Sequence, residues 1–243
     1  HEFVTPSGRL SPNSQTAYLL ALHFGLLDQQ NIPAAVNYLT TDIIKRNYHL
    51  STGFLGTPYI CEVLTKNGHA DIAYRLLLQK TYPSWLYPIT RGATTIWERW
   101  DGIKPDGSFQ DKSMNSFNHY AYGAIGDWMY RESAGIEAMK PGYKQIRIQP
   151  LITKKLTYSK ASLESQYGTI ASGWERKEGK VTVKVKVPAN TRATIVLPVD
   201  DPGKISVNGN PLSSSLLFTN VGSTANSIKF EAGSGEYTFE FSE

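Results

Sequence analysis

The sequence predicts an α+β protein with two domains, a helical domain over residues 1–140 and an antiparallel β-sandwich over residues 141–243. Two observations predict this order. Apolar residues recur at helical spacing in the first part of the chain, and they alternate with polar residues at strand spacing in the second part. The change falls near Pro141-Gly142, a pair that ends regular structure. We therefore expect a domain boundary at about residue 140.

The helical domain begins with four predicted helices. They span residues 14–27, 34–47, 59–66 and 69–80. Ser11-Pro12 marks the start of the first helix and Pro33 that of the second, while Asn67-Gly68 separates the third from the fourth. Since short loops join the members of each pair, we expect helical hairpins.

Residues 82–110 predict a long irregular connection, because prolines and glycines interrupt every periodic pattern there. Its tryptophans and tyrosines argue against disorder, and a long loop in a compact domain is usually functional. A helix is expected to resume at about Asn115 and to run to Gly135. Four of its apolar residues are expected in the core: Phe117, Tyr120, Ile125 and Trp128.

The sandwich domain contains eight predicted strands. The clearest runs from Val181 to Val187, where valines alternate with threonine or lysine, as in a strand with one buried face. The others span residues 146–148, 162–167, 169–176, 191–197, 204–207, 227–231 and 236–241. Turns are expected at 177–180 and at Asn208-Gly209, and Trp174 is expected inside the sandwich.

Composition excludes several classes of function. The 243 residues are 40% apolar, enough for a large core, and no run is long enough to span a membrane. The formal net charge of +4 is spread over the chain, which argues against a nucleic-acid partner. Cys61 is the only cysteine and is expected to be buried as a small hydrophobe.

The N-terminus carries no signal peptide and no initiator methionine, so we expect a piece of a longer polypeptide, and the compartment, cytoplasmic or secreted, stays open. The aspartates and histidines lack the spacing of calcium or zinc ligands, and glycine-rich phosphate loops and a nucleophilic serine elbow are absent. We expect no metal and no cofactor.

One carboxylate, Glu98, and one histidine, His119, lie among aromatic residues. A pyranose packs its apolar C–H faces on aromatic rings and bonds its hydroxyls to polar groups, so this mixture is typical of a sugar site.

Four stretches make the chain resemble the C-terminal portion of bacterial α-L-rhamnosidases, glycoside hydrolase family seventy-eight. They are residues 93–100 (Ala-Thr-Thr-Ile-Trp-Glu-Arg-Trp), 116–120 (Ser-Phe-Asn-His-Tyr), 126–131 (Gly-Asp-Trp-Met-Tyr-Arg) and 141–150 (Pro-Gly-Tyr-Lys-Gln-Ile-Arg-Ile-Gln-Pro). The resemblance implies helical hairpins of a partial (α/α)6 barrel followed by a C-terminal β-sandwich. It also implies hydrolysis of terminal α-L-rhamnosyl groups with inversion of configuration.

The resemblance assigns the general base to Glu98 and a rhamnose-binding role to His119. Further candidates for contact with the sugar are aromatic: Trp97, Trp100, Trp85 and Tyr87. The family's general acid belongs to an upstream acidic motif that these residues do not contain. Expected partners are a rhamnose-containing oligosaccharide or glycoside, and either the remainder of the barrel or a second copy of the chain.

Other interpretations stay open at this stage. Glu98 alone would also fit a surface carboxylate paired with Arg99, and His119 would also fit a core histidine. The missing acid favours a non-catalytic carbohydrate-binding or structural module. A glycosidase of the same architecture that acts on another sugar is a third possibility.

Overall fold

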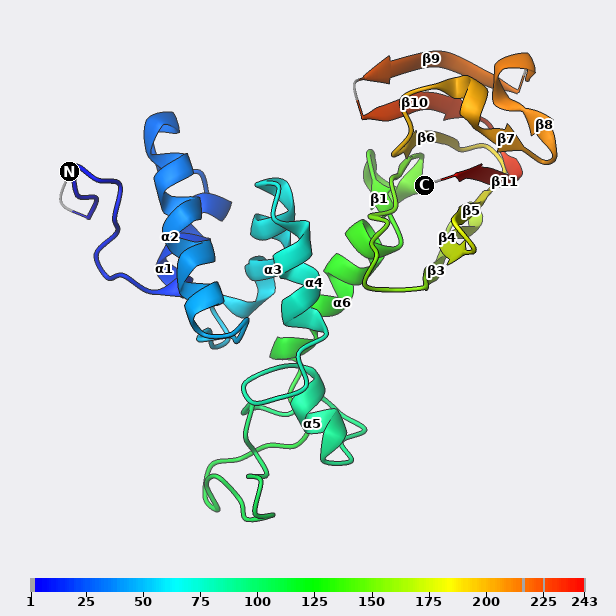
Figure 1. The fold of residues 1–243 in the computed structure, drawn as a ribbon. Coiled ribbons are helices and arrows are strands. Elements are labelled where there is room, and N and C mark those ends of the chain that lie inside the picture. Colours follow the sequence, from blue (N-terminus) through cyan, green and yellow to red (C-terminus); the bar gives the residue numbers. More distant parts are fainter. Residues whose placement is uncertain (1–2, 216, 225, 243) are drawn as a thin grey trace. The chain divides into compact units, whose positions relative to one another are not determined.

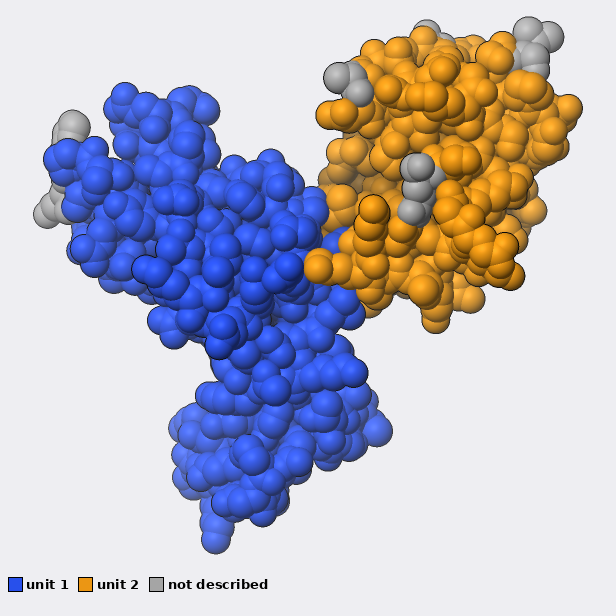
Figure 2. Space-filling view, viewed as in Figure 1, with its two compact units in different colours: residues 1–126 blue, residues 127–243 orange. Residues whose placement is uncertain are grey.

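The computed structural model describes residues 3–215, 217–224 and 226–242. The chain forms two compact units, residues 1–126 and 127–243, which Figure 2 shows in different colours. Helices gather in the first unit and strands in the second (Figure 1). The predicted α+β fold class is therefore confirmed.

Unit 1 contains the predicted helical hairpins. Its helices are α1 (Gln15–His23), α2 (Ile32–Lys45), α3 (Thr57–Lys66), α4 (Ala70–Leu77) and the short α5 (Leu86–Thr90), with 3-10 turns η1 (Gln29–Asn31) and η2 (Ala121–Ala124). Helix α1 packs against α2 and α3, and α3 packs against α4. Apart from α5, residues 82–110 are irregular, as predicted.

Local chemistry sets the ends of these helices. The Ser14 hydroxyl accepts the Ala17 N–H at 3.2 Å and caps the start of α1. Gly25 takes a φ of +64°, and the Leu26 N–H donates to the Ala21 carbonyl at 2.9 Å, so α1 ends before the predicted end at Leu27. Gly68, at a φ of +82°, ends α3 in the same way and confirms the predicted stop.

The single helix predicted over residues 115–135 is wrong in its first part. Residues 115–120 are irregular, and the helical segment that follows passes from η2 through α6 (Ile125–Trp128) to the π-helical turn η3 (Met129–Ser133). The first part is not helical because its polar groups bond to residues 95–102 instead. Trp128 is buried as predicted, but Tyr120 is 88% exposed and does not belong to the core.

Unit 2 contains two sheets, with strand orders β1-β2-β6-β10-β9 and β3-β4-β5-β11-β7-β8. The strands are β1 (Ile136–Ala138), β2 (Gln145–Ile148), β3 (Tyr158–Ser165), β4 (Gly168–Lys177), β5 (Lys180–Val187), β6 (Arg192–Leu197), β7 (Ser206–Val207), β8 (Asn210–Pro211), β9 (Phe218–Thr224), β10 (Ser227–Ala232) and β11 (Gly235–Ser242). Short 3-10 turns lie at η4 (Pro141–Tyr143), η5 (Pro202–Lys204) and η6 (Leu212–Ser214). Strands β2 and β6 pair in parallel, whereas the other pairings found in the described part of the chain are antiparallel.

The two sheets enclose one apolar core. The four alternate valines of β5 are all buried in it, as predicted. Trp174 is also buried there and donates its indole N–H to the Ser133 carbonyl at 2.8 Å. Both predicted turns form, with positive φ at Glu178-Gly179 and at Asn208-Gly209, the geometry of tight hairpin connections.

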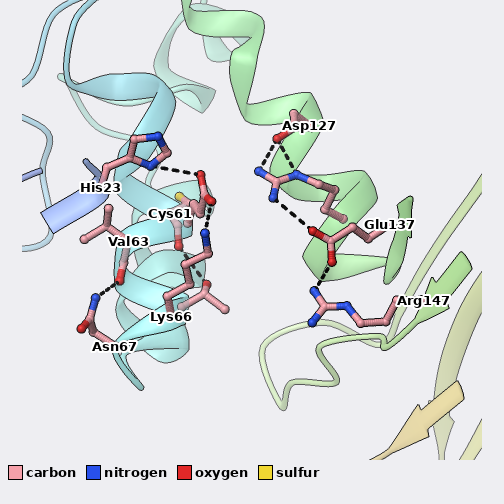
Figure 3. A network of polar contacts seen from close by, with 11 residues as sticks. His23, Cys61, Val63, Lys66, Asn67, Asp127, Glu137 and Arg147 are labelled. Carbon is pink, nitrogen blue, oxygen red and sulfur yellow. Dashed lines mark hydrogen bonds and ion pairs between the residues drawn. The ribbon is translucent and has the colours of Figure 1, made fainter. Parts of the chain in front are cut away.

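Two polar networks in Figure 3 support the elements within each unit. In unit 1 the buried Glu62 of α3 pairs with Lys66 and lies 3.6 Å from the His23 imidazole of α1. Burial raises the pKa of the neighbouring Cys61 thiol, the free cysteine predicted to be buried. The network joins α1 to α3.

The network of unit 2 joins η3 to the strand pair β1 and β2. Arg131 donates to Asp127 at 2.5 Å and lies 3.8 Å from Glu137, which pairs in turn with Arg147 (Figure 3).

In the described ranges, no helix has both the length and the apolarity needed to cross a membrane.

Candidate functional site

Glu98 lies in the irregular segment between α5 and η2, alongside residues 116–119. Its N–H donates to the Ser116 carbonyl at 2.9 Å, and its Oε2 accepts the Ser116 N–H at 2.8 Å. Within the described part of the chain, no hydrogen bond to Oε1 is found. The side chain is partly buried. One carboxylate oxygen is thus anchored, and the other is available to take a proton from water.

Arg99 points to different partners. Its Nε donates to the Met114 carbonyl at 3.0 Å, and its guanidinium lies 4.0 Å from Asp111. No ion pair between Glu98 and Arg99 occurs among the described residues. The alternative of a surface carboxylate paired with Arg99 therefore has no support in this geometry.

His119 is tied to the same segment as Glu98. Its N–H donates to the Ile96 carbonyl at 2.8 Å, two positions before Glu98. Its Nδ1 accepts the N–H of Ala121, the first residue of η2, at 3.3 Å. Because a neutral imidazole has one donor and one acceptor nitrogen, this bond places the proton on Nε2. His119 therefore offers a single hydrogen-bond donor, at its ring edge.

Two aromatic rings lie nearly parallel to the His119 imidazole. Phe54 stacks at 4.6 Å with an interplanar angle of 7°, and Tyr120 at 5.5 Å with an angle of 6°. Phe54 comes from the turn before α3 and was not singled out by the sequence, because nothing in the local sequence links that turn to His119. It remains 41% exposed. The structure thus adds Phe54 and Tyr120 to the candidate site.

Two of the predicted stacking residues, Trp85 and Trp100, hold neighbouring segments of the candidate site together. The Trp85 indole donates to the Tyr122 carbonyl at 3.0 Å, and the Trp100 indole donates to the Thr52 carbonyl at 3.1 Å. Trp100 stacks on the Tyr122 ring at 3.7 Å, and Trp85 meets Trp100 edge-on at 5.7 Å. These contacts connect the loop of Thr52 and Phe54 to the segment that follows His119.

The residues Trp85, Trp97 and Tyr87 are only 7%, 4% and 6% exposed. Tyr87 donates its hydroxyl to the Ile103 carbonyl at 2.8 Å, and Trp97 packs edge-on against Phe117 at 5.2 Å. Their contact with a sugar stays a prediction, and this burial argues against it. Trp100 is only partly buried and keeps some free surface.

Burial, assisted by nearby Tyr82, Glu98 and Asp101 and opposed by Arg99, raises the pKa of Tyr122 to about 12. Tyr122 is therefore a neutral hydroxyl at physiological pH. Asp111 accepts hydrogen bonds from the N–H and the hydroxyl of Ser113, and these bonds lower the pKa of its carboxyl group.

Among the described residues, no three histidine, cysteine or acidic side chains are grouped to hold a metal ion.

The helical hairpins, the two sheets and the aromatic surroundings of Glu98 agree with the glycosidase class that the sequence motifs resemble. A family model described as the bacterial alpha-L-rhamnosidase 6 hairpin glycosidase domain matches residues 1–132. A second, the bacterial alpha-L-rhamnosidase C-terminal domain, matches residues 135–210. The chain belongs to the bacterial α-L-rhamnosidase family.

Individual relatives agree with this assignment. An alpha-L-rhamnosidase of Streptomyces avermitilis is 42% identical, and the match covers 98% of this chain and 22% of the relative's length. An alpha-L-rhamnosidase of Formosa agariphila is 43% identical, and the match covers 93% of this chain and 24% of that relative's length. The solved structure of the Streptomyces enzyme complexed with L-rhamnose has a TM-score of 0.90 over 98% of the chain and 22% of that structure. A Dictyoglumus thermophilum alpha-L-rhamnosidase structure, 32% identical, has a TM-score of 0.83 over 95% of the chain and 25% of that structure.

The chain spans less than a quarter of the length of these two sequence relatives. It matches their C-terminal portion.

Proposed function

We propose that the chain is the base-bearing part of an inverting α-L-rhamnosidase that releases terminal α-L-rhamnosyl groups from rhamnosides. Family membership supports the reaction, and the geometry of Glu98 supports its role. With Oε2 held by the Ser116 N–H, the carboxylate has a fixed orientation and one oxygen for a water molecule. That orientation is the observation that carries the proposal.

In this reaction Glu98 removes a proton from water while the water oxygen attacks the anomeric carbon. A general acid on the opposite face donates a proton to the glycosidic oxygen as the bond to the aglycone breaks. Inversion requires the two carboxyl groups to lie roughly 6.5–9.5 Å apart, which leaves room for the water. We place the acid in a part of the enzyme outside this sequence.

His119 completes the proposal as a ligand of the sugar. Its Nε2–H donates to a rhamnose hydroxyl, while Trp100 and the other predicted aromatic residues are the candidates for contact with the sugar's apolar face. In our assignment residues 1–140 form the C-terminal part of an (α/α)6 catalytic barrel, and residues 141–243 form the C-terminal sandwich domain.

The barrel assignment implies a protein partner for unit 1. Several large apolar side chains of this unit are exposed, among them Phe24, Leu26, Leu55 and Ile89. Exposed apolar surface of this kind is usually covered by another polypeptide segment. We propose that the remaining hairpins of the barrel, or a second copy of the chain, cover these residues.

The stereochemistry of the first product tests the reaction. The complete enzyme that carries this chain is mixed with an aryl α-L-rhamnoside, and proton NMR follows the first seconds of hydrolysis. We expect β-L-rhamnose to form before the anomers equilibrate. Initial release of the α anomer contradicts inversion, and binding of rhamnose without hydrolysis of any rhamnoside supports a carbohydrate-binding module instead.

A further inference from the structure

We infer that the outer face of strands β3, β4 and β5 in unit 2 is a further carbohydrate-binding site, which holds a neutral oligosaccharide in a groove beside Tyr130 and Tyr158. The groove has a volume of about 810 Å³, within the usual range for small-molecule sites. All of its lining residues belong to unit 2, and none belongs to the candidate site around Glu98. The inference therefore goes beyond the proposed function and does not depend on it.

The register of the three strands forms the floor of the groove. Residues directly opposite each other on paired strands have their side chains on the same face of a sheet. Their neighbours in the chain, such as Trp174 and Val183, are buried in the core. Two adjacent rows of exposed or partly exposed residues thus cross the outer face: Tyr158, Glu175 and Thr182 in the first, and Lys160, Gly173 and Lys184 in the second.

Gly173 makes this face concave. It lies between two lysines in its row and has no side chain of its own. A Cβ at this position would lie 2.7 Å from the Cβ of Lys160 and 3.1 Å from the Ser159 carbonyl oxygen, so a larger residue would displace β3. Close packing of β3 on β4 therefore leaves a hollow in which a ligand can approach the backbone.

Tyr130 lines the groove beside β3, the edge strand of its sheet. It belongs to the motif at residues 126–131, and the proposed reaction gives its ring no role. Its hydroxyl donates to the Ser162 carbonyl at 3.4 Å, and the end of its π-helical turn is fixed to β4 by the bond from Trp174 to Ser133. The residue is still 44% exposed, and Tyr158 is 59% exposed. Two tyrosine rings are thus available to a ligand.

The polar groups around the hollow match the hydroxyls of a sugar. Lys160 and Lys184 are donors, Glu175 is an acceptor, and the Thr182 hydroxyl is both. Within the described part of the chain, no ion pair engages either lysine or Glu175. An apolar ligand would desolvate these charges, and an anion would meet the carboxylate. A neutral sugar offers donors, acceptors and apolar C–H faces together, as the groove and its two rings require.

Chemical-shift mapping on the chain itself tests the inference. The ¹⁵N-labelled chain is titrated with two neutral probes, a trisaccharide of α-L-rhamnose and cellotriose, and with trigalacturonate as an acidic comparison. We expect at least one neutral probe to shift the signals of residues 158–162, 171–175 and 182–184, with little change between low salt and about 0.5 M salt. Tighter, salt-dependent binding of trigalacturonate overturns the assignment to a neutral sugar. The absence of these shifts with both neutral probes overturns the site.

Variants of Tyr158 test the role of its ring. Tyr158→Ala should weaken binding roughly ten-fold, whereas Tyr158→Phe should keep the native affinity, because stacking needs the ring and not the hydroxyl. Met139→Ala is the matched control, since Met139 is 54% exposed in unit 2 and does not line the groove. It should bind as the native chain does. Native affinity in Tyr158→Ala, with Tm unchanged, contradicts the inference.

The complete enzyme decides whether another part of the polypeptide occupies the groove. Tyr158→Cys is treated there with a maleimide, and mass spectrometry identifies the labelled peptide. We expect rapid labelling, which the oligosaccharide slows. Protection of position 158 until the enzyme unfolds shows that protein covers the groove, and this overturns the inference.

The titration of the chain also separates this inference from the proposed function. Shifts confined to residues 96–119 would support the proposed site around Glu98 and refute the groove. Shifts confined to the groove would support the groove without supporting the proposed function.

Discussion

Replacing Trp100 by phenylalanine separates a supporting role of this residue from contact with the sugar. The substitution removes the hydrogen bond from the indole to the Thr52 carbonyl, 3.1 Å long and partly buried, and retains a ring against Tyr122. A hydrogen bond of this kind contributes about 1 kcal/mol, and the smaller ring loses some burial. We expect the free energy of unfolding to fall by about 1–2 kcal/mol and Tm to fall by roughly 2–8 °C.

Urea unfolding of the chain, followed by circular dichroism, measures this loss. Trp85→Phe is the companion variant, because its indole makes an equivalent bond to the Tyr122 carbonyl at 3.0 Å in a more buried position. Trp85→Phe should lower the free energy of unfolding by about 2 kcal/mol. Since the two indoles meet edge-on at 5.7 Å, the double variant should show a coupling of about 0.5–1 kcal/mol.

A change of less than about 0.3 kcal/mol in Trp100→Phe would refute the supporting role. So would additive losses in the double variant, because the two rings would then not act through a shared contact. Weakened rhamnose binding at unchanged stability would instead identify Trp100 as a sugar-stacking surface.

Three further predictions concern stability and reactivity. Gly135→Ala should cost more than about 2 kcal/mol, because Gly135 has a φ of +83° and a Cβ there would lie 2.3 Å from the Pro150 nitrogen; thermal unfolding that matches the native chain would contradict this. The pKa of Asp111 is lowered by Ser113, so its stabilising effect is present above the ordinary aspartate pKa and is lost as pH falls through the lower folded value; Asp111→Asn should flatten the acid limb of stability against pH, and an unchanged limb would count against it. Burial raises the pKa of Cys61, so the thiol should react with a disulfide reagent only after unfolding; rapid reaction of the folded chain would show that it is accessible.

The sequence predicts most clearly those strands in which apolar and polar residues alternate. The valines of β5 show this alternation most clearly, and every one is buried. Strands β1, β8 and β9 were not predicted. Strand β9 contains few apolar residues, and its pairing with β10 shifts register between Lys229 and Glu231, so long-range pairing rather than local sequence determines it.

The candidate site was predictable only where its residues lie in the two neighbouring motifs at residues 93–100 and 116–120. Glu98 and His119 are near in sequence and their segments run alongside each other in the structure. Phe54 comes from a different hairpin, and Tyr120 looked like a core residue because it fitted a helical spacing. That helix does not form, since Glu98, Ile96 and Gly102 bond to residues 115–119 instead. Long-range hydrogen bonds override the local pattern here.

The catalytic effect of Glu98→Gln in the complete enzyme tests the central claim most directly. Glutamine keeps the size of the side chain and can still accept the Ser116 N–H, but it cannot take a proton from water. We predict a fall in kcat of roughly 10²–10⁴-fold, with KM and Tm close to native, while Glu178→Gln, in the exposed turn after β4, has no effect. Turnover within a few fold of the native rate would contradict the assignment of Glu98 as the general base.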